Sequence, residues 1–285
     1  MGRMTSARDA VLVEAAQLAA EFAGDRPPVV LDVRWLLGGP PGHGEYLKGH
    51  LPGAVFVDLD TELALPPDER TAADGRHPLP DPAAFEASVR RWGVDDGDPV
   101  VAYDDNGSMA AARAWWLLRW AGFADVRLLD GGLAAWTAAG GALTTDDVVP
   151  EPGTATVRAG QLPAITAEEA GAWPGDGVLL DARAAERYRG ETEPVDPKAG
   201  HIPGAVNAPT GGNLAPDGRF LPADELRARF EALGATGDAS VAAYCGSGVT
   251  AAHEIAALAI AGVDAALYPG SWSQWSNLDL PVETV

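Results

Sequence analysis

The sequence predicts an α/β protein of two tandem domains, each a mostly parallel β-sheet flanked by helices. Three observations lead to this prediction: the chain has 285 residues, short apolar runs alternate with helical patterns, and one set of sequence blocks occurs twice. A chain of this length accommodates two domains of ordinary size. Alternation of strands and helices is typical of a parallel sheet covered by helices. We therefore expect a duplicated domain.

Four sequence blocks recur in the same order and at nearly constant spacing. The pairs are Val29–Arg34 with Val178–Arg183, Gly49–Val55 with Gly200–Val206, Val101–Asp104 with Ala242–Cys245, and Asp130–Trp136 with Pro269–Trp275. Ordered repeats of this kind indicate a tandem duplication. They predict a first domain over residues 1–143, a linker over 144–163 and a second domain over 164–285. The linker prediction reflects the many Thr, Asp, Pro and Gly residues between Leu143 and Pro163 and their lack of periodicity.

Each copy contains four short apolar runs that we predict to be strands. The runs are continuous, as expected for parallel strands buried on both faces. They span Val29–Val33, Val55–Val57, Val100–Tyr103 and Val126–Leu129 in the first copy, and Val178–Asp181, Ala205–Asn207, Val241–Tyr244 and Ala265–Tyr268 in the second. Helical patterns between them are Pro82–Arg91, Ala110–Ala121, Ala223–Leu233 and Val249–Ala261.

Charge and composition narrow the range of functions. A formal net charge of −21 repels phosphate backbones and anionic lipids, so we expect neither nucleic acid nor a membrane as a partner. The single cysteine excludes an internal disulfide and fits a reducing compartment. With no apolar run of spanning length and no signal-peptide pattern, we expect a cytoplasmic protein. The histidines and the cysteine lack metal-ligand spacing and no nucleotide-binding glycine motif occurs, so we expect no metal and no cofactor.

The cysteine, Cys245, stands where a predicted strand is followed by a predicted helix. The first turn of a helix leaves backbone N–H groups unpaired, and the helix dipole favours negative charge there. Gly246 and Gly248 allow the loop to curl and to direct several N–H groups at one point. Such an environment stabilises a thiolate and equally an anionic persulfide. We therefore predict that Cys245 is a nucleophile; the alternative is a small buried hydrophobic side chain.

The loop Cys245–Thr250 resembles the active-site loop of the rhodanese superfamily of sulfurtransferases. The resemblance covers nearly the whole chain, because both repeats, the His-x-Pro-Gly-Ala blocks and the Gly-Ser-Trp-Ser-x-Trp tail are similar to the family pattern. It implies two rhodanese-like domains, of which the first is non-catalytic, because Asp104 stands where the second carries Cys245. It also implies that the transferred sulfur is carried as a persulfide. Loop residues implied in substrate binding are Gly246, Gly248, Val249 and Thr250.

The resemblance further implies that arginines bind an anionic substrate. Arg187 stands at the family's substrate-binding position, and a planar guanidinium grips a carboxylate or sulfonate with two parallel hydrogen bonds. Arg189 is a second candidate. Mercaptopyruvate sulfurtransferases of the family carry another substrate arginine a few residues farther along, and this sequence has none there. Lys198 is a candidate replacement, as a point charge.

A Ser/His/Asp set is implied as well, formed by Ser247, His77 and Asp60. In such a set, an imidazole oriented by a carboxylate accepts a proton from the serine or from the donor thiol. The alternative is that the three side chains only make hydrogen bonds within their loops.

The expected reaction is sulfur transfer from a small anionic donor to a thiol, cyanide or thioredoxin-like acceptor. We favour 3-mercaptopyruvate as the donor, because thiosulfate enzymes of the family usually carry a basic pair in place of Gly246 and Ser247. The alternatives are a thiosulfate:cyanide sulfurtransferase and a non-catalytic binding module of the same fold. A cysteine-dependent phosphatase is disfavoured, because Ala251 stands where that chemistry needs an arginine.

Overall fold

The computed structural model describes residues 6–285 and divides into two compact units. Residues 1–5 of the first expected domain lie outside the described residues. Unit 1 contains the chain up to Ala64, Pro80–Leu162 and Pro216–Phe220, and unit 2 contains Leu65–Leu79, Pro163–Ala215 and Leu221–Val285. The stretch expected as a linker therefore belongs to unit 1 as far as Leu162. Each copy of the repeat also contributes one short segment to the compact unit of the other.

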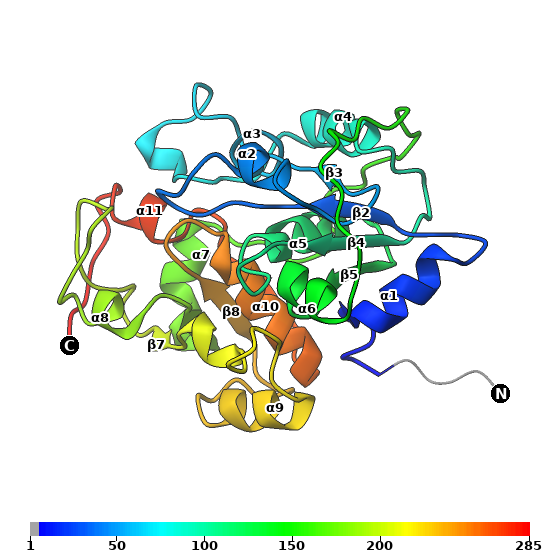
Figure 1. Ribbon diagram of the computed structural model, residues 1–285. Helices are drawn as coiled ribbons and strands as arrows, with labels where there is room; N and C mark the ends of the chain where they lie inside the picture. Colours follow the sequence, from blue (N-terminus) through cyan, green and yellow to red (C-terminus); the bar gives the residue numbers. More distant parts are fainter. Residues whose placement is uncertain (1–5) are drawn as a thin grey trace. The chain divides into compact units, whose positions relative to one another are not determined.

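Unit 1 is built on a five-stranded parallel sheet in the order β1-β5-β4-β2-β3 (Figure 1). The strands are β1 Leu12–Val13, β2 Val29–Asp32, β3 Val55–Phe56, β4 Val100–Tyr103 and β5 Val126–Leu129. The helices are α1 Ala15–Phe22, α2 Gly42–Tyr46, α3 Leu59–Glu62, α4 Pro82–Arg91, α5 Ala111–Trp120 and α6 Gly132–Ala138. Helices α1 and α6 share one buried cluster with the sheet, and α5 packs on β4 and β5. The four predicted strands are confirmed; β1 has only two residues, too few to show a periodicity.

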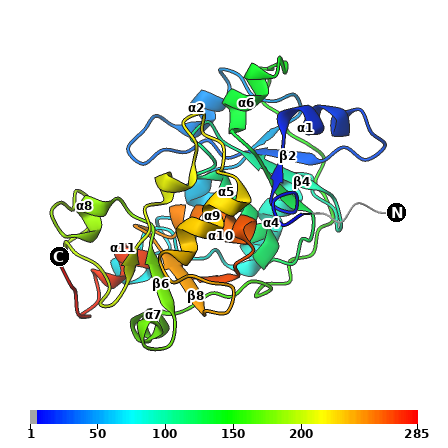
Figure 2. The same cartoon turned by 90° about the horizontal axis from the view of Figure 1, so that it is seen from below.

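Unit 2 repeats the plan with four parallel strands in the order β7-β6-β8-β9. The strands are β6 Val178–Asp181, β7 Val206–Asn207, β8 Val241–Tyr244 and β9 Ala265–Leu267. Helices α7 Ala167–Ala172 and α11 Ser271–Trp275 share a buried cluster with one face of the sheet. Helix α10 Thr250–Ala261 packs on β8, β9 and α9 Ala223–Glu231 (Figure 2). The short helix α8 Ala185–Tyr188 and the 3-10 helices η1 Ala72–Asp74, η2 Trp173–Gly175 and η3 Thr210–Asn213 complete the unit.

Strand β8 and helix α10 are both interior elements, which explains their sequences. All four residues of β8 are buried, and ten of the twelve residues of α10 are buried. A helix that is apolar around its whole circumference belongs in a protein interior. The helix ends at Gly262, whose φ of 82° is the left-handed conformation that commonly terminates helices. The loop from Cys245 to Val249 is thus held between two buried elements. Within residues 6–285, none of the helices has both the length and the apolar character that crossing a membrane requires.

A buried ion pair closes the carboxyl end of the sheet in unit 2. The Arg183 guanidinium donates to both carboxylate oxygens of Asp181, with Nη2 at 2.6 Å from Oδ2, and Nη2 also donates to the carbonyl of Gly200 at 2.7 Å. The Tyr244 hydroxyl accepts the N–H of Ile202 at 3.1 Å, and the Arg183 guanidinium lies 5.8 Å from the centre of the Tyr244 ring. These bonds join the ends of β6 and β8 to the His-x-Pro-Gly-Ala turn.

Unit 1 contains the same arrangement at the repeated positions. Arg34 Nη2 donates to Asp32 at 2.6 Å and to the carbonyl of Gly49 at 2.9 Å, while Tyr103 donates to Asp32 and accepts from the Leu51 N–H. The Arg in the repeated Leu-Asp-x-Arg block therefore has a structural role in both units. A buried charge is tolerated only when it is paired in this way.

The histidines of the repeated turns also serve the fold. His50 stacks on Tyr46 and His201 stacks on Tyr188, each with ring centroids 3.8 Å apart. Each Nδ1 bonds to the carbonyl of the tyrosine on which it stacks, at 3.0 Å and 2.8 Å respectively. Equivalent geometry in both units explains why the two sequence blocks are alike.

Helix α10 carries one buried acidic side chain on the side of η3. Glu254 Oε2 accepts the Asn213 amide at 2.7 Å, and the neighbouring His253 Nδ1 lies 2.6 Å from Thr210 Oγ1. Burial raises the pKa of Glu254 to about 7, although hydrogen bonds to Thr210 and Asn213 act in the opposite direction. The carboxyl therefore keeps its proton in the fold at pH values where it is ionised in the unfolded chain.

We predict that Glu254 makes the protein less stable as the pH rises through neutrality. A carboxyl with a raised folded-state pKa contributes stability that is fully present below the unfolded pKa of about 4.5 and is lost as the pH passes through about 7. Glu254→Gln removes this dependence, so the variant should gain up to about 3 kcal/mol relative to wild type between about pH 5 and pH 8. Urea unfolding across this pH range measures the difference. Exposed Glu225→Gln is the control, and parallel curves for both variants would contradict the prediction.

Candidate functional site

The predicted nucleophile lies at the carboxyl end of β8, in the loop that leads into α10. Cys245 is 1% exposed, and its Sγ accepts the backbone N–H of Gly248 at 3.1 Å. Its own N–H donates to Ser271 Oγ at 3.1 Å. Val249 directly precedes the helix, and Thr250 is the first helical residue. The sulfur is therefore held in a short turn at a helix N-terminus, as the sequence predicts.

The start of α11 holds the carbonyl groups of this loop. Trp272 N–H donates to the Cys245 carbonyl at 2.9 Å, and Ser273 N–H donates to the Gly246 carbonyl at 2.8 Å. These two bonds hold the backbone of the loop in which the Gly248 N–H donates to the sulfur. Trp272 is itself completely buried in the core of unit 2.

Gly248 is the loop residue whose lack of a side chain matters most. Its φ is +80°, and a Cβ added there would lie 2.4 Å from the Pro269 carbonyl oxygen. The carbonyl contact excludes a side chain unless the backbone moves, and the positive φ disfavours one further. The conformation that places the Gly248 N–H on Cys245 Sγ therefore requires glycine.

Unit 1 shows what the equivalent loop does with a carboxylate. Asp104 is completely buried, and its two oxygens accept four backbone N–H groups, at 2.8–3.0 Å, from Asn106, Ser108, Ala110 and Ala111. Burial raises the pKa of Asp104, and these four hydrogen bonds oppose that shift. The duplicated loop thus forms an anion cradle, by which we mean a set of converging backbone N–H groups. In unit 1 the Asp104 side chain fills it.

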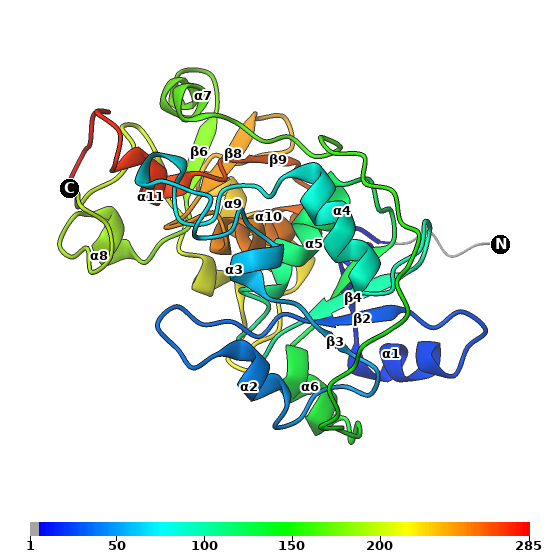
Figure 3. The same ribbon diagram turned by 90° about the horizontal axis from the view of Figure 1, so that it is seen from above.

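Ser247 and His77 meet inside unit 2. His77 Nδ1 lies 2.8 Å from Ser247 Oγ, and both residues are buried. His77 precedes the middle of the chain in sequence, yet its segment Leu65–Leu79 belongs to the compact unit of Cys245. Gln274 on α11 donates to the Ala73 carbonyl at 2.9 Å. Figure 3 shows this segment, in cyan around residues 72–74, beside α11.

Asp60, the third member of the implied set, belongs to unit 1. It lies in the first turn of α3, where its Oδ2 accepts the indole N–H of Trp35 at 3.0 Å. The joint action of Asp60 with the serine and histidine stays a prediction.

Arg187, in the last turn of α8, faces the nucleophile's loop. A Cβ added to Gly246 would lie 3.4 Å from Arg187 Nη1. The same guanidinium donates to Glu193 through Nη2 at 2.6 Å and through Nε at 3.2 Å, and Nη2 lies 3.4 Å from Asp196 Oδ2. Arg189 is placed differently: its side chain is 40% exposed and grips the carboxylate of Glu191.

A second guanidinium, missed by the sequence reasoning, also lies at this loop. Arg76 Nη2 donates to the Gly246 carbonyl at 3.2 Å, and Nη1 pairs with Asp196. Lys198, the replacement suggested by sequence, instead donates to the Leu278 carbonyl at 2.8 Å. In the sequence, only its position next to His77 points to Arg76. Its contact with Gly246 joins residues 170 positions apart in the chain, which no local pattern records.

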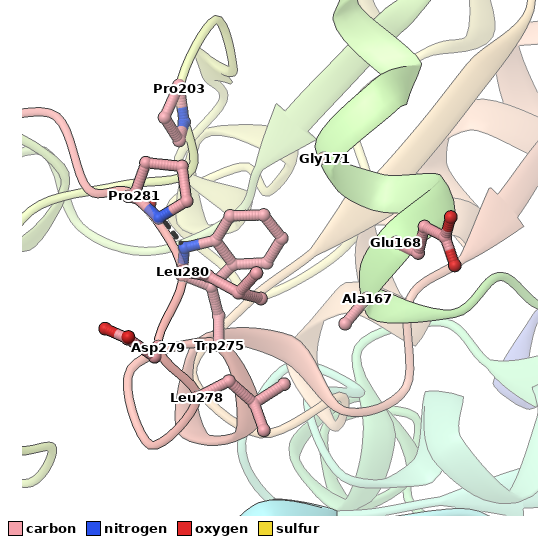
Figure 4. A pocket seen from close by; sticks show the side chains of 9 residues that line it. All are labelled: Ala167, Glu168, Gly171, Pro203, Trp275, Leu278, Asp279, Leu280 and Pro281. Carbon is pink, nitrogen blue, oxygen red and sulfur yellow. Dashed lines mark hydrogen bonds between the residues drawn. The ribbon is translucent and has the colours of Figure 1, made fainter.

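Unit 2 also contains a largely apolar hollow that is separate from these side chains. Its volume is about 460 Å³, and its lining includes Trp275, Leu278 and Leu280, with Pro281 accepting the Trp275 indole N–H (Figure 4). No predicted site residue lines it. A hollow of about 540 Å³ is lined in part by Arg76 and Asp196. In the part of the chain that the structure describes, no group of three His, Cys, Asp or Glu side chains is arranged to hold a metal ion.

Comparison with known proteins agrees with this geometry. The rhodanese-like domain family matches residues 14–139 and again residues 166–278. A Mycobacterium tuberculosis protein provisionally named thiosulfate sulfurtransferase SseB is 52% identical over 95% of each chain. A Pseudomonas aeruginosa protein provisionally named 3-mercaptopyruvate sulfurtransferase is 49% identical over 93% of this chain and 95% of its own length. The crystal structure of SseA, a 3-mercaptopyruvate sulfotransferase from Escherichia coli, superposes with a TM-score of 0.80 at 32% identity, covering 92% of this chain and 98% of its own.

We predict that Gly248→Ala damages the site without unfolding the protein. The left-handed φ and the Pro269 carbonyl together strain an alanine by about 1–3 kcal/mol, and relief of that strain moves the N–H away from Cys245 Sγ. The rate of sulfur transfer should fall by about tenfold or more, as measured by steady-state kinetics. Gly237→Ala is the matched control, because a Cβ there meets no atom within 4 Å. Equal rates for the two variants would show that the glycine is not required.

Proposed function

Because this chain belongs to the rhodanese-like family and is a sulfurtransferase, we propose that Cys245 carries the transferred sulfur as a persulfide. The observation that carries the proposal is the loop geometry, with a backbone N–H on Sγ at the N-terminus of a buried helix. The equivalent loop of unit 1 supports it, since that loop directs four backbone N–H groups at the carboxyl oxygens of Asp104. Unit 1 has a carboxylate in place of a thiol and is the non-catalytic partner.

The donor we propose is 3-mercaptopyruvate. The Cys245 thiolate attacks the donor sulfur, so an S–S bond forms and the C–S bond breaks, with its electron pair passing to carbon. The resulting pyruvate enolate must take up a proton, and the donor's S–H must give one up. The products are then pyruvate and the Cys245 persulfide anion. This reaction is covalent catalysis with backbone N–H groups as its electrostatic support.

The contact between Ser247 and His77 supports this choice of donor. A hydroxyl and an imidazole 2.8 Å apart can move a proton from the donor sulfur to the pyruvate carbon. Thiosulfate needs no such relay, because transfer of its outer sulfur leaves sulfite and no proton changes place. A buried Ser–His pair beside the nucleophile is thus of use to the carbon-bound donor.

Thiosulfate remains the alternative donor, in keeping with the name of the Mycobacterium tuberculosis relative. Arg187 serves either donor, because a guanidinium pairs with a carboxylate or a sulfonate. A binding module without activity is the weaker alternative, because the thiol, its N–H donor and the Ser–His pair are all present in unit 2.

The second half-reaction returns the enzyme to its starting state. A thiophilic acceptor, which we propose to be cyanide, a small thiol or a thioredoxin-like protein, attacks the outer sulfur of the persulfide. The S–S bond breaks and its electron pair returns to Cys245 as the thiolate. Since the cycle needs a reduced Cys245, we assign the protein to a reducing compartment, the cytoplasm.

We predict that Cys245→Ser folds normally and loses sulfur transfer by several orders of magnitude, since a hydroxyl cannot store sulfane sulfur. Mass spectrometry of the intact wild-type protein after exposure to donor should show the addition of one sulfur atom, and the variant should show none. Transfer by the serine variant at a rate comparable to wild type would reject the persulfide mechanism.

We further predict that the Ser–His pair discriminates between donors. Wild type should have a higher kcat/KM for 3-mercaptopyruvate than for thiosulfate. His77→Gln should lower kcat/KM for mercaptopyruvate by about a hundredfold, a usual loss for a missing proton-transfer group, and should leave thiosulfate activity nearly unchanged. His43→Gln, which alters a half-exposed histidine paired with Asp147, is the control. An equal loss with both donors, or a wild-type preference for thiosulfate, would contradict this assignment.

A further inference from the structure

We infer that Arg76 is a second binding residue for the anionic head of the sulfur donor, acting together with Arg187. The inference rests on the proposed function, because it concerns the donor of the same reaction. Arg76 lies outside the loop Cys245–Thr250, whose sequence resembles the family's active-site loop. Arg76 comes from the segment Leu65–Leu79, which belongs to the compact unit of Cys245.

Two guanidinium groups converge at the residue after the nucleophile. A Cβ added to Gly246 would lie 3.2 Å from Arg76 Nη2, 3.4 Å from Arg187 Nη1 and 3.7 Å from Arg187 Nη2. The point where a side chain would begin is therefore in van der Waals contact with two cations. Glycine at this position keeps the space between the cations and the loop open for a small ligand.

Buried acids hold the two cations together. Asp196 pairs with Arg76 through Oδ1 and with Arg187 through Oδ2, and Glu193 binds Arg187 from another side. The side chains of both acids are only 3% exposed. Burial raises the pKa of Asp196, while the charge of Arg76 and its hydrogen bond lower it. Without such acids, two guanidinium groups at this separation would repel each other.

The pair keeps donors available on the side of the loop. Arg187 binds its acids through Nε and Nη2, and within residues 6–285 its Nη1, the atom nearest the Gly246 position, makes no hydrogen bond. Among the described residues, Nη2 of Arg76 donates only to the Gly246 carbonyl, so one of its two N–H groups is unused. Arg76 is 25% exposed and Arg187 19% exposed, and Arg76 lines the hollow of about 540 Å³. Both guanidinium side chains are thus partly accessible to solvent.

The chemistry of this arrangement fits a carboxylate or a sulfonate. A planar guanidinium offers two parallel N–H donors to such an anion. Two guanidinium groups meeting at one point can each bind one of its oxygen atoms, while the donor sulfur faces the neighbouring Cys245. Because the two acids balance the charge of the two arginines, recognition of the anion depends on the N–H groups directed at it and not on an excess of positive charge.

The test compares full-length wild type with Arg76→Gln, which keeps an N–H donor for the Gly246 carbonyl but loses the charge. We expect its KM for 3-mercaptopyruvate to rise about ten- to a hundredfold, as for loss of a charged hydrogen bond, with kcat changed far less. Arg76→Lys should lie between the two, because lysine keeps the charge and lacks the fork. Arg158→Ala is the control, because Arg158 is 62% exposed and lies 3.8 Å from Asp96.

A second measurement separates donor binding from a purely structural role. Persulfide loaded on Cys245 is discharged with dithiothreitol, a neutral thiol, and this rate should be the same in wild type and in Arg76→Gln. An unchanged KM overturns the inference. Equal slowing of loading and discharge with a lowered Tm also overturns it, in favour of a loop-supporting role. If the glutamine variant does not fold, the same comparison on Arg76→Lys decides. Absence of any persulfide in wild type would instead reject the proposed function.

Discussion

The buried pair of Asp181 and Arg183 is the interaction on which the site of unit 2 depends. It lies at the carboxyl end of β6, binds the Gly200 carbonyl, and places the Arg183 guanidinium 5.8 Å from the centre of the Tyr244 ring. Tyr244 is the last residue of β8, so its position sets where Cys245 begins the loop. On the other side, Arg183 Nη1 lies 3.5 Å from Glu193, the acid that binds Arg187. One buried pair therefore connects the nucleophile's strand with the arginine beside its loop.

Such a pair carries a cost that explains why it is so completely bonded. Removing two charges from water is unfavourable, and the loss is recovered only when all donors and acceptors find partners. Arg183 meets this requirement with a carboxylate, a carbonyl, a second acid and the face of Trp272 at 4.4 Å. The duplicated pair of Asp32 and Arg34 does the same in unit 1. Its presence in both units shows that the pair stabilises the fold and is not specific to the site of unit 2.

The difference between the two units lies in what fills the anion cradle. In unit 1 the Asp104 carboxylate takes four N–H groups and leaves the loop without a reactive atom. In unit 2 a thiol stands at the same strand end, with one N–H on its sulfur. The same backbone architecture thus serves as a structural anchor in one copy and, under the proposed function, as the support of the nucleophile in the other. The persulfide anion proposed for Cys245 is larger than a thiolate, and the N–H groups at the helix start offer it further electrostatic support.

The sequence by itself determined the duplication, the parallel strands, the loop from Cys245 to Thr250 and the rhodanese-like family, because each of these leaves a local pattern of apolar residues, glycines or repeated blocks. Only the tertiary structure decided that Leu65–Leu79 belongs to the unit of Cys245, that His77 meets Ser247, that Arg187 faces the loop while Arg189 binds Glu191, and that Arg76 joins Arg187 at Gly246. The physical reason is that side-chain contacts between residues far apart in the chain depend on how packed elements bring them together. Neither the spacing of residues nor the local propensity records such a contact.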